Sequence, residues 1–301
     1  MDAVISAVKD ETFVINTVKR GKKQKSPAPP FITSTLQQEA SRRLNMTPRR
    51  TMSIAQQLYE AGLITYMRTD STNLSSLAIN TAKEAVTNLY GADYSKVRLY
   101  RTRVKGAQEA HEAIRPTYIS NSEVTGTAAE KRLYNLIWKR TIACQMADAI
   151  VEKTVVSIRG SKTGCTFLAE GEKILFDGFL KVYIEGRDDE QSEDVSSLPN
   201  LTQGQPVSCR RTVAVERFTQ RPLRFSEASL VKKLEELGIG RPSTYAPTIT
   251  TLLKRGYVIK GDKPGTVRPY KEIVLENGSL EETVKNETVG AEKKKLLPEN
   301  I

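Results

Sequence analysis

The spacing of hydrophobic residues changes period twice along this chain. Near the N-terminus, Phe13, Ile15 and Val18 are separated by polar residues, as in a strand pair or the edge of a sheet. From about residue 31 to residue 150 the hydrophobic residues recur with helical spacing, and from residue 151 the alternation returns. Strands at both ends of a helical part predict one sheet domain with a helical domain inserted into it.

A basic stretch that ends in prolines follows the first strand signal. Residues 19–30 have the sequence KRGKKQKSPAPP, which is rich in lysine, arginine and proline. This composition is typical of a linker or of a place where the chain crosses between domains. The helical part is therefore expected to begin at residue 31.

Four helices are expected in the helical part. The first two begin with Thr or Ser followed three residues later by Gln, which is the form of a capping box. Gly62 is expected to stop the second helix and Gly91 the third. The expected ranges are 35–45, 53–62, 75–90 and 127–149.

Strands return after residue 150. The alternation predicts strands at 151–158, 165–169, 174–184 and 207–215. After residue 278 the sequence is charged and weakly patterned, and no finished element is expected there.

A second helical region lies between these strands and the C-terminal residues. Ser226 should cap a helix that ends at Gly238, and Ser243 or Thr244 should cap a second helix that runs to about Arg255. The segments on either side of residues 261–265 are expected to pair as a hairpin. Two helices followed by a hairpin are typical of a winged helix, a common DNA-binding unit.

The charge balance limits the partners of the chain. Lys and Arg number 46 against 35 Asp and Glu in 301 residues, which leaves a net charge of +11. A basic chain favours polyanions, because each cation near a phosphate releases condensed counterions. No apolar run approaches the roughly 18 to 20 residues of a membrane span, and no signal pattern begins the chain. We therefore expect a cytoplasmic protein without a membrane partner.

Residues that commonly bind metals are few. Cys144, Cys165 and Cys209 lie far apart and form no C-x-x-C pair, which argues against a disulfide framework and a zinc site. His111 is the single histidine, so no chemistry can depend on a histidine cluster. No metal site is expected within the chain.

The segment GLITYMRTDS, residues 62–71, has the clearest chemical potential. Gly62 should end a helix, and in an extended segment after it Tyr66 and Arg68 point to the same side. A phenol with a pKa near ~10 is a weak nucleophile, but a neighbouring arginine stabilises phenolate and holds a phosphate under attack. The phosphotyrosine ester would keep the energy of the broken bond, so resealing would need no ATP. A tyrosine packed at a helix end beside a solvated arginine remains the open alternative.

This segment resembles the active-site segment of type IA DNA topoisomerases. Three further segments resemble motifs of the same family in the same order: PFITSTLQQEA at residues 30–40, QEAHEAIRPT at residues 108–117, and the stretch from FSEASL to GIGRPSTY at residues 225–245. Met67 after the tyrosine, and the sequence around His111, are similar to the bacterial topoisomerase I branch.

The resemblance implies roles for individual residues. Tyr66 matches the nucleophile that takes the 5′ phosphate, and Arg68 matches the arginine that positions it. His111 and Glu112 match a motif beside the cleavage site. The other residues expected to bind DNA or to support the active site are Gln56, Glu60, Thr65, Thr69, Asp70, Arg115, Arg241, Ser243 and Thr244.

The resemblance also implies an α+β multidomain fold. A β-sheet gate or arch domain would comprise residues 1–30 and 151–217, with an inserted helical, winged-helix-like domain carrying the tyrosine at 31–150. A truncated C-terminal winged-helix DNA-binding domain would occupy 218–301. The arch would form a hole for DNA, and the helical domain would swing away about hinges near 26–30 and 150–156.

The implied activity is ATP-independent relaxation of negatively supercoiled DNA. One strand would be cleaved through a 5′-phosphotyrosine link, the other passed through, and the break resealed. The family's Mg²⁺ is bound by an N-terminal Toprim domain. We expect this chain to lack that domain and the C-terminal modules. It should then bind single-stranded DNA as a monomer at the bacterial nucleoid, without full activity and without a metal of its own.

Two other classes of protein compete with this interpretation. A non-catalytic winged-helix DNA-binding protein would explain the positive charge and the C-terminal helices, but not the segment around Tyr66. A tyrosine recombinase also forms a phosphotyrosine, but it needs a dispersed Arg, His and Arg set with its tyrosine late in the chain. Tyr66 lies early, so the recombinase is disfavoured.

Overall fold

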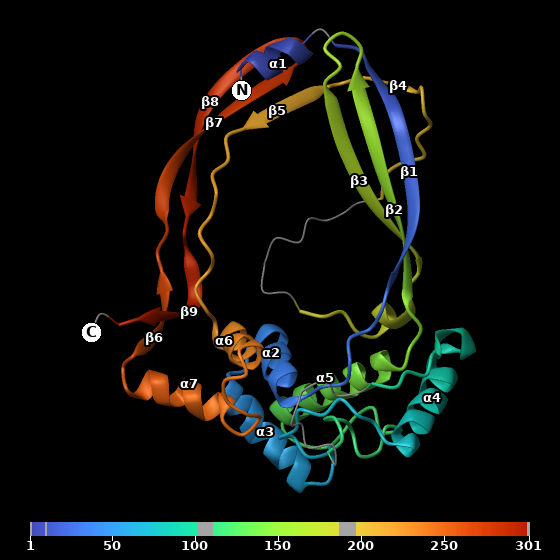
Figure 1. Ribbon diagram of the computed structural model, residues 1–301, viewed down its shortest axis with the longest axis vertical. Helices are drawn as coiled ribbons and strands as arrows, with labels where there is room; N and C mark the ends of the chain where they lie inside the picture. Colours follow the sequence, from blue (N-terminus) through green and yellow to red (C-terminus); the bar gives the residue numbers. More distant parts are fainter. Residues whose placement is uncertain (1, 10, 101–110, 187–196, 300–301) are drawn as a thin grey trace.

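The computed structural model of the chain describes residues 2–9, 11–100, 111–186 and 197–299. Most of its helices gather at one end of the molecule, and its strands rise from them as two arms that meet at the opposite end (Figure 1). The elements therefore form a ring. None of the helices in the described ranges combines the length and the hydropathy that crossing a bilayer requires.

The first arm is a four-stranded antiparallel sheet with the order β3-β2-β1-β4. Its strands are β1 (Phe13–Lys25), β2 (Ala149–Gly160), β3 (Thr166–Phe176) and β4 (Pro206–Val207). Strand β1 pairs with β2 along its whole length, from Phe13 opposite Gly160 to Lys25 opposite Ala149. The chain therefore leaves the sheet at the end of β1 and returns to it in the neighbouring strand, with the helices inserted between the two.

In the helical block inserted between β1 and β2, the described residues form four α-helices. They are α2 (Thr33–Leu44), α3 (Pro48–Glu60), α4 (Ser76–Tyr90) and α5 (Ala128–Cys144), with a 3₁₀ turn η1 (Ala92–Tyr94) after α4. Hydroxyl side chains cap three of them, as their sequences favour. Ser75 accepts from the Ala78 N–H at 3.3 Å, and Thr127 forms a reciprocal capping box with Glu130.

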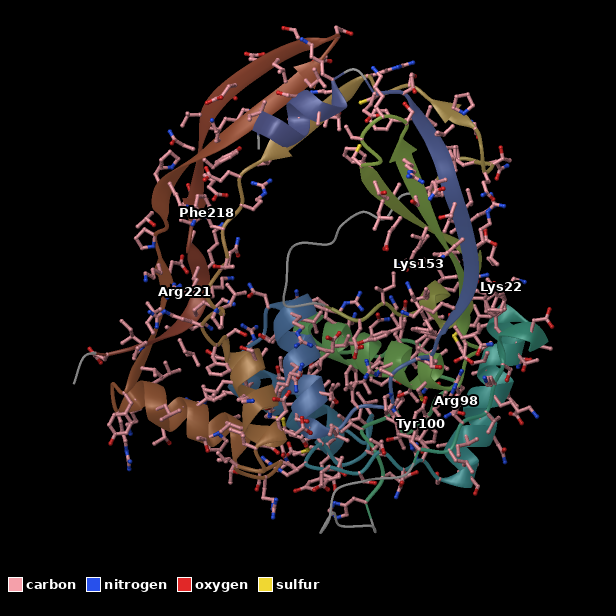
Figure 2. All side chains as sticks on the ribbon, turned by 45° about the horizontal axis from the view of Figure 1, so that its top comes forward. Lys22, Arg98, Tyr100, Lys153, Phe218 and Arg221 are labelled. Carbon is pink, nitrogen blue, oxygen red and sulfur yellow. The ribbon has the colours of Figure 1, made fainter. Side chains whose placement is uncertain are left out.

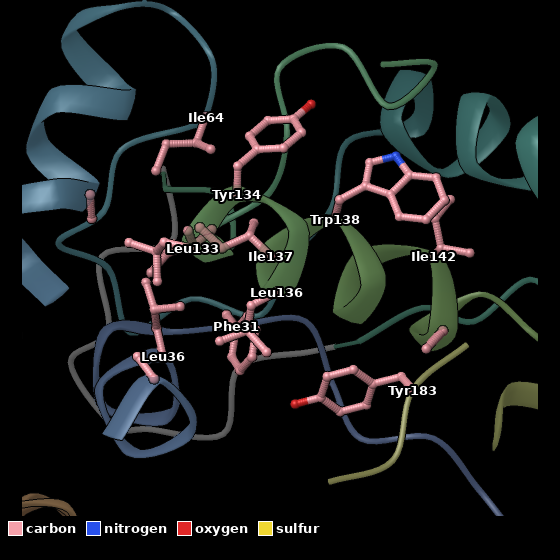
Figure 3. Close-up of a cluster of buried hydrophobic side chains, with 14 of the residues drawn as sticks. Phe31, Leu36, Ile64, Leu133, Tyr134, Leu136, Ile137, Trp138, Ile142 and Tyr183 are labelled. Atoms are coloured by element: carbon pink, nitrogen blue, oxygen red, sulfur yellow. The ribbon is translucent and has the colours of Figure 1, made fainter. Parts of the chain in front are cut away.

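The core of the helical block fixes the segment that carries Tyr66. Phe31, Leu36, Leu133 and Ile137 are fully buried together with Ile64, which lies two residues before the tyrosine (Figure 3). The polar tips of the large aromatic side chains in this core are satisfied: the Trp138 indole donates to the Ile119 carbonyl at 2.8 Å, and the Tyr134 hydroxyl donates to the Asn121 carbonyl at 2.6 Å. The base of the Tyr66 segment is therefore part of a packed core, and not of a free loop.

The second arm combines strands with a pair of helices at its foot. Strands β5 (Arg211–Val215), β7 (Thr266–Glu276) and β8 (Ser279–Val289) form a sheet with the order β5-β7-β8, and β6 (Val258–Lys263) pairs with β9 (Glu292–Pro298). The helix pair is α6 (Glu227–Glu236) and α7 (Tyr245–Lys254). Helix α6 packs against α2, and α7 packs against α3.

The two arms join where helix α1 (Asp2–Val8) lies against β7. Ile5 and Val8 of this helix form a small buried cluster with Phe13 of β1 and with Ile273 and Leu275 of β7. Only strands were predicted for the first 20 residues, and that prediction was wrong for α1. The residues Ile5 and Val8 lie one helical turn apart, and their burial against a distant strand is not visible in the local pattern.

Several predicted element boundaries were also wrong. The second helix begins at Pro48, because Thr47 caps it by accepting from the Arg50 N–H at 3.2 Å, and Ser53 lies inside it. Helix α2 begins at Thr33, and α5 ends at Cys144. Strand β3 runs through 166–176 without a break and is followed by the 3₁₀ turn η2 (Gly178–Lys181), while 207–215 is split between two sheets.

The predicted hairpin after α7 is not formed. Strand β6 pairs with β9, with Val258 opposite Pro298, whereas β7 pairs with β5 and β8. The residues after 278, for which no element was predicted, supply both β8 and β9. The coarse expectation of a fold that mixes helices with sheets is met. In place of the wing that was expected to follow the helix pair, β6 pairs with β9, and the paired strands β7 and β8 lie between them in the sequence.

Candidate active site

The segment that carries Tyr66 leaves α3 through a left-handed glycine and is then held by a short ladder. Gly62 has a φ of +70°, a conformation that favours glycine and ends the helix. The Thr65 N–H donates to the Arg115 carbonyl at 2.9 Å, and the Thr117 N–H donates to the Leu63 carbonyl at 3.0 Å. The Thr65 hydroxyl accepts from the Arg115 N–H at 3.0 Å. Thr65 and Arg115, both predicted to support the site, therefore align this segment with residues 113–117.

Thr33 of α2 holds the same segment from its other end. Its N–H donates to the Thr69 carbonyl at 2.9 Å, and its hydroxyl donates to the Met67 carbonyl at 2.8 Å and accepts from the Thr69 N–H at 2.9 Å. Met67 and Thr69 are buried, whereas Tyr66 and Arg68 reach the surface. This alternation agrees with the extended segment that the sequence predicted.

Tyr66 is accessible, and two rings flank it. Its side chain is 38% exposed. The Tyr59 ring lies 5.3 Å away and the His111 ring 5.8 Å away, both measured between centroids and both in edge-to-face geometry. The two neighbours restrict the ring of Tyr66 while its exposed surface stays open to a ligand. The structure thus brings His111, predicted from its motif, next to the tyrosine.

Arg68 is oriented by the exposed face of α3. Its guanidinium donates to Gln56 Oε1 at 3.1 Å, and Gln56 Nε2 donates to Glu60 Oε1 at 2.7 Å. Gln56, Tyr59 and Glu60 lie within one turn of the helix, so a single face of α3 contacts both Arg68 and Tyr66. Sequence reasoning named Gln56 and Glu60 but missed Tyr59, although its place three residues after Gln56 on the same face could have indicated it.

Glu112 and Arg115 join the start of α4 to the segment that pairs with the tyrosine segment. Glu112 accepts from the Ser75 N–H and from the Arg115 guanidinium, both at 2.6 Å, and so ties the start of α4 to residues 112–117. Burial by itself would raise the pKa of Glu112, but the hydrogen bonds from Arg115 and Ser75 outweigh it and hold the pKa below its usual value. Residues 108–110, the first part of the predicted histidine motif, lie outside the described residues.

Asp70 connects the segment to the second arm. Its charge acts on Glu235 of α6 and on Tyr245 of α7, and Glu235 in turn accepts from the Ser34 hydroxyl of α2 at 2.6 Å. No motif singled out Glu235 or Ser34. The sequence offered no signal for their contact, because 201 residues separate them.

Arg241, Ser243 and Thr244 lie at the start of α7, away from the tyrosine. Thr244 was expected to cap the helix, but its hydroxyl accepts from the Arg241 N–H at 2.8 Å and forms no cap. Arg241 and Ser243 are exposed. Among the described residues, no hydrogen bond, ion pair or ring contact links these three to Tyr66.

The described residues do not fit a magnesium site of their own. In the part of the chain that the structure describes, no three His, Cys, Asp or Glu side chains lie close enough together to hold an ion. A magnesium ion prefers several oxygen ligands in near-octahedral geometry, and Asp70 or Glu112 alone would supply too few.

Comparison with known proteins identifies the family. The family model for DNA topoisomerase matches residues 1–274. The chain belongs to the DNA topoisomerase family. It is 46% identical over 265 residues to the DNA topoisomerase 1 of Rickettsia felis, covering 83% of this chain and 34% of that protein. It is 46% identical over 269 residues to the DNA topoisomerase 1 of Streptomyces coelicolor, covering 86% of this chain and 28% of that protein.

A solved topoisomerase structure has the same fold. The full-length topoisomerase I of Thermotoga maritima superposes with a TM-score of 0.72 at 35% identity, over 86% of this chain and 44% of that one. These comparisons confirm the resemblance to bacterial type IA DNA topoisomerase I. The topoisomerase chain described here spans about a third of the length of the curated relatives it matches.

Proposed function

We propose that this chain is the part of a type IA DNA topoisomerase that carries the DNA-cleaving tyrosine, with Tyr66 as the nucleophile. The observation that supports the proposal most strongly is the accessible Tyr66 phenol beside His111, on a segment where α3 orients Arg68. The chain would cleave one strand, allow the other to pass and reseal the break, and so relax negatively supercoiled DNA.

The chemistry follows from this arrangement. The Tyr66 oxygen attacks the phosphorus, the bond from phosphorus to the 3′ oxygen breaks, and a 5′-phosphotyrosine ester forms. The phenol gives up its proton, and the departing 3′ oxygen takes one up. The Arg68 guanidinium offsets the charge that develops on the phosphate, and its hydrogen bond to Gln56 keeps the guanidinium in place. Attack of the 3′ hydroxyl on the ester reverses each bond change without ATP.

Strand passage requires the ring to open. We assign residues 1–30 and 151–217 to a gate or arch domain, 31–150 to the inserted winged-helix-like domain and 218–301 to the DNA-binding domain. Hinges near 26–30 and just before Ala149 would let the helical block move away from α6 and α7 after cleavage. The second hinge, expected from the sequence at 150–156, is moved because those residues are paired within strand β2. The proposal is supported by the insertion of the helical block between β1 and β2, because both connections then lie at one end of the same strand pair.

The DNA partner is assigned from charge and from the foot of the second arm. Both arms carry basic side chains, among them Lys22 and Lys153 on the first arm and Arg221 on the second (Figure 2). Exposed Arg241 and Ser243 at the start of α7 add a cation and a hydroxyl of the kind that contact DNA phosphates. We assign single-stranded DNA and negatively supercoiled DNA as the partners, and the bacterial nucleoid as the place of action.

The complete reaction would need a further unit. We propose that a Toprim domain of the parent protein supplies the Mg²⁺ that the family uses, and that this chain acts as a monomer with it. The chain's own residues would supply the nucleophile, the phosphate-binding arginine and the moving gate.

A cleavage assay with a labelled single-stranded oligonucleotide tests the proposal. Wild type, Tyr66→Phe and Tyr59→Phe would each be assayed with and without a separately produced Toprim domain, and the products separated under denaturing conditions. A covalent adduct should form with wild type and with Tyr59→Phe only when the Toprim domain is present, and never with Tyr66→Phe. Tyr59→Phe is the matched control, because it removes the neighbouring exposed hydroxyl and keeps the ring.

Two results would contradict the proposal. An adduct that persists in Tyr66→Phe would assign the nucleophile to another residue. Binding without an adduct in every combination would instead make the chain a non-catalytic DNA-binding protein.

A further inference from the structure

Helices α6 and α2 meet beside the segment that carries Tyr66 (Figure 1). Their polar contact is a hydrogen bond from the buried Ser34 hydroxyl of α2 to Glu235 Oε1 of α6, at 2.6 Å. Ser34 follows Thr33, whose N–H and hydroxyl hold Met67 and Thr69. One turn of α2 therefore contacts the tyrosine segment through Thr33 and the second arm through Ser34.

Glu235 lies in a mostly acidic environment. The charges of Glu236, on the same helix, and of Asp70, on the tyrosine segment, both act on the Glu235 carboxyl. Tyr245 of α7 is in turn influenced by the charges of Glu235, Arg241 and Asp70. Within the described ranges, Glu235 forms no ion pair with a lysine or arginine. Burial raises the pKa of the Glu235 carboxyl, the Ser34 hydrogen bond opposes this, and the Glu236 and Asp70 carboxylates raise it further.

Helix α2 also carries a buried polar group without a partner. Gln37 lies one turn after Thr33 and is fully buried, and neither atom of its side-chain amide has a hydrogen-bond partner among the described residues. Buried polar groups without partners destabilise the state that contains them. The Ser34–Glu235 hydrogen bond therefore joins α6 to a helix that already contains an unsatisfied buried amide.

We propose that Glu235 is a positioning residue that controls how readily the helical block with Tyr66 separates from α6 and α7. The hydrogen bond from Ser34 holds the two parts together. A negative charge on Glu235 beside Asp70 loosens them. This inference rests on the proposed function, in which the two parts separate to let a DNA strand pass.

The direction of the pH dependence follows from the geometry. When α6 leaves α2, Glu235 becomes solvated and moves away from Asp70, so its pKa falls back toward the ordinary value and a proton is released. Docking is then strongest at pH values below the ordinary carboxyl pKa of about 4.3. It weakens as pH rises through the raised pKa of the docked state, and it becomes constant above that.

Amide hydrogen exchange measured by mass spectrometry tests the inference on this chain without DNA. Exchange in α6 and α2 would be followed from about pH 5 to about pH 8, corrected for the intrinsic rate at each pH, with α5 as the internal reference. In wild type, protection of α6 relative to α5 should fall by roughly threefold or more as pH rises over this range. The reason is that Glu235 loses its proton while half-buried, and its negative charge is then repelled by that of Asp70.

Three variants separate the charge from the fold. Glu235→Gln keeps a group that can accept from Ser34 and removes the charge, so protection of α6 should be higher than in wild type at neutral pH and independent of pH. Asp70→Asn should move the wild-type profile to lower pH. Glu236→Gln removes an exposed charge that Lys233 pairs at 3.3 Å. Glu236 stays beside Glu235 on the same helix whether or not α6 is docked, so its loss should alter both states alike and change the profile least.

The outcome decides the inference independently of the cleavage chemistry. If Glu235→Gln and wild type show the same pH dependence while α5 stays protected, Glu235 does not control the separation and the inference is wrong. Should Glu235→Gln fail to fold, an unchanged profile in Asp70→Asn leads to the same conclusion. Because no adduct is measured, the exchange result stands whether or not Tyr66 proves to be the nucleophile.

Discussion

Arg140 is expected to be the side chain whose loss most weakens the link between the helical block and the first arm. It lies in α5 and is only 3% exposed. Its Nε donates to the Pro29 carbonyl at 2.6 Å, and another guanidinium nitrogen donates to Glu185 at 2.9 Å. Pro29 lies where the chain leaves β1, and Glu185 follows the segment that leaves β3. One guanidinium therefore holds two of the segments that connect the block to the arm.

The size of the effect can be worked out from these contacts. A hydrogen bond from a charged group contributes roughly 1.5 to 3 kcal/mol. The Arg140 guanidinium also lies 4.9 Å from the Phe31 ring and 5.2 Å from the Tyr183 ring, and each cation–π contact adds about 0.5 to 1 kcal/mol. The ion pair with Glu185, which is 54% exposed, adds about 1 kcal/mol at most. Burial of the charge offsets part of this sum. Arg140→Met should therefore lower the free energy of unfolding by roughly 3 kcal/mol.

Urea unfolding followed by tryptophan fluorescence measures this change. Trp138 is the single tryptophan, lies in the same helix and is buried, so its emission reports on the helical block. Arg132→Met is the matched control. Arg132 is exposed on α5 and, among the described residues, its side chain hydrogen-bonds the Ala128 carbonyl of its own helix, so the change should stay within about 0.5 kcal/mol. A loss below about 1 kcal/mol in Arg140→Met would refute the reasoning, because the desolvation of the guanidinium would then cancel its contacts.

Two further predictions concern titration. Burial alone would raise the pKa of Glu112, but the hydrogen bonds from Arg115 and Ser75 outweigh it, so the net pKa is lowered. Ionised Glu112 therefore stabilises the fold at pH values above its ordinary pKa, and this stabilisation is lost as pH falls through the lowered pKa of the folded state. Acid unfolding of Glu112→Gln, followed by circular dichroism, should depend less steeply on pH than that of wild type, and equal slopes would contradict this. Burial raises the pKa of the Cys144 thiol to about 12, whereas Cys209 is exposed. Iodoacetamide at mildly alkaline pH should therefore modify Cys209 and spare Cys144 in peptide mass mapping, and equal labelling of the folded chain would show that Cys144 is accessible.

The sequence by itself determined the elements whose ends depend on near neighbours. Ser226 was predicted as a cap and is confirmed as one, and the helices expected from residues 75 and 127 are capped by Ser75 and Thr127, because each cap hydrogen bond joins residues three positions apart. Gly62 and Gly91 stop helices because their positive φ values suit glycine alone. The family could also be assigned from sequence, since its motifs are contiguous.

Tertiary structure decided whatever depends on a distant partner. The choice of β9 over β7 as the neighbour of β6 is a competition between strands, and the local alternation is the same for either pairing. Helix α3 is capped by Thr47 and not by Ser53. Thr51 and Met52, which precede Ser53, are buried, so the helix starts earlier in the sequence than the capping signal at Ser53 indicated.

The candidate site divides in the same way. The motif gave Tyr66, Arg68 and His111, and the fold brings Tyr66 and His111 into contact. Tyr59 lay in no motif, and Glu235 lay in a motif stretch but was given no role. They reach the tyrosine segment only because α3 packs beneath it and α6 docks on α2, and such contacts between residues far apart in sequence leave no periodic trace in the chain.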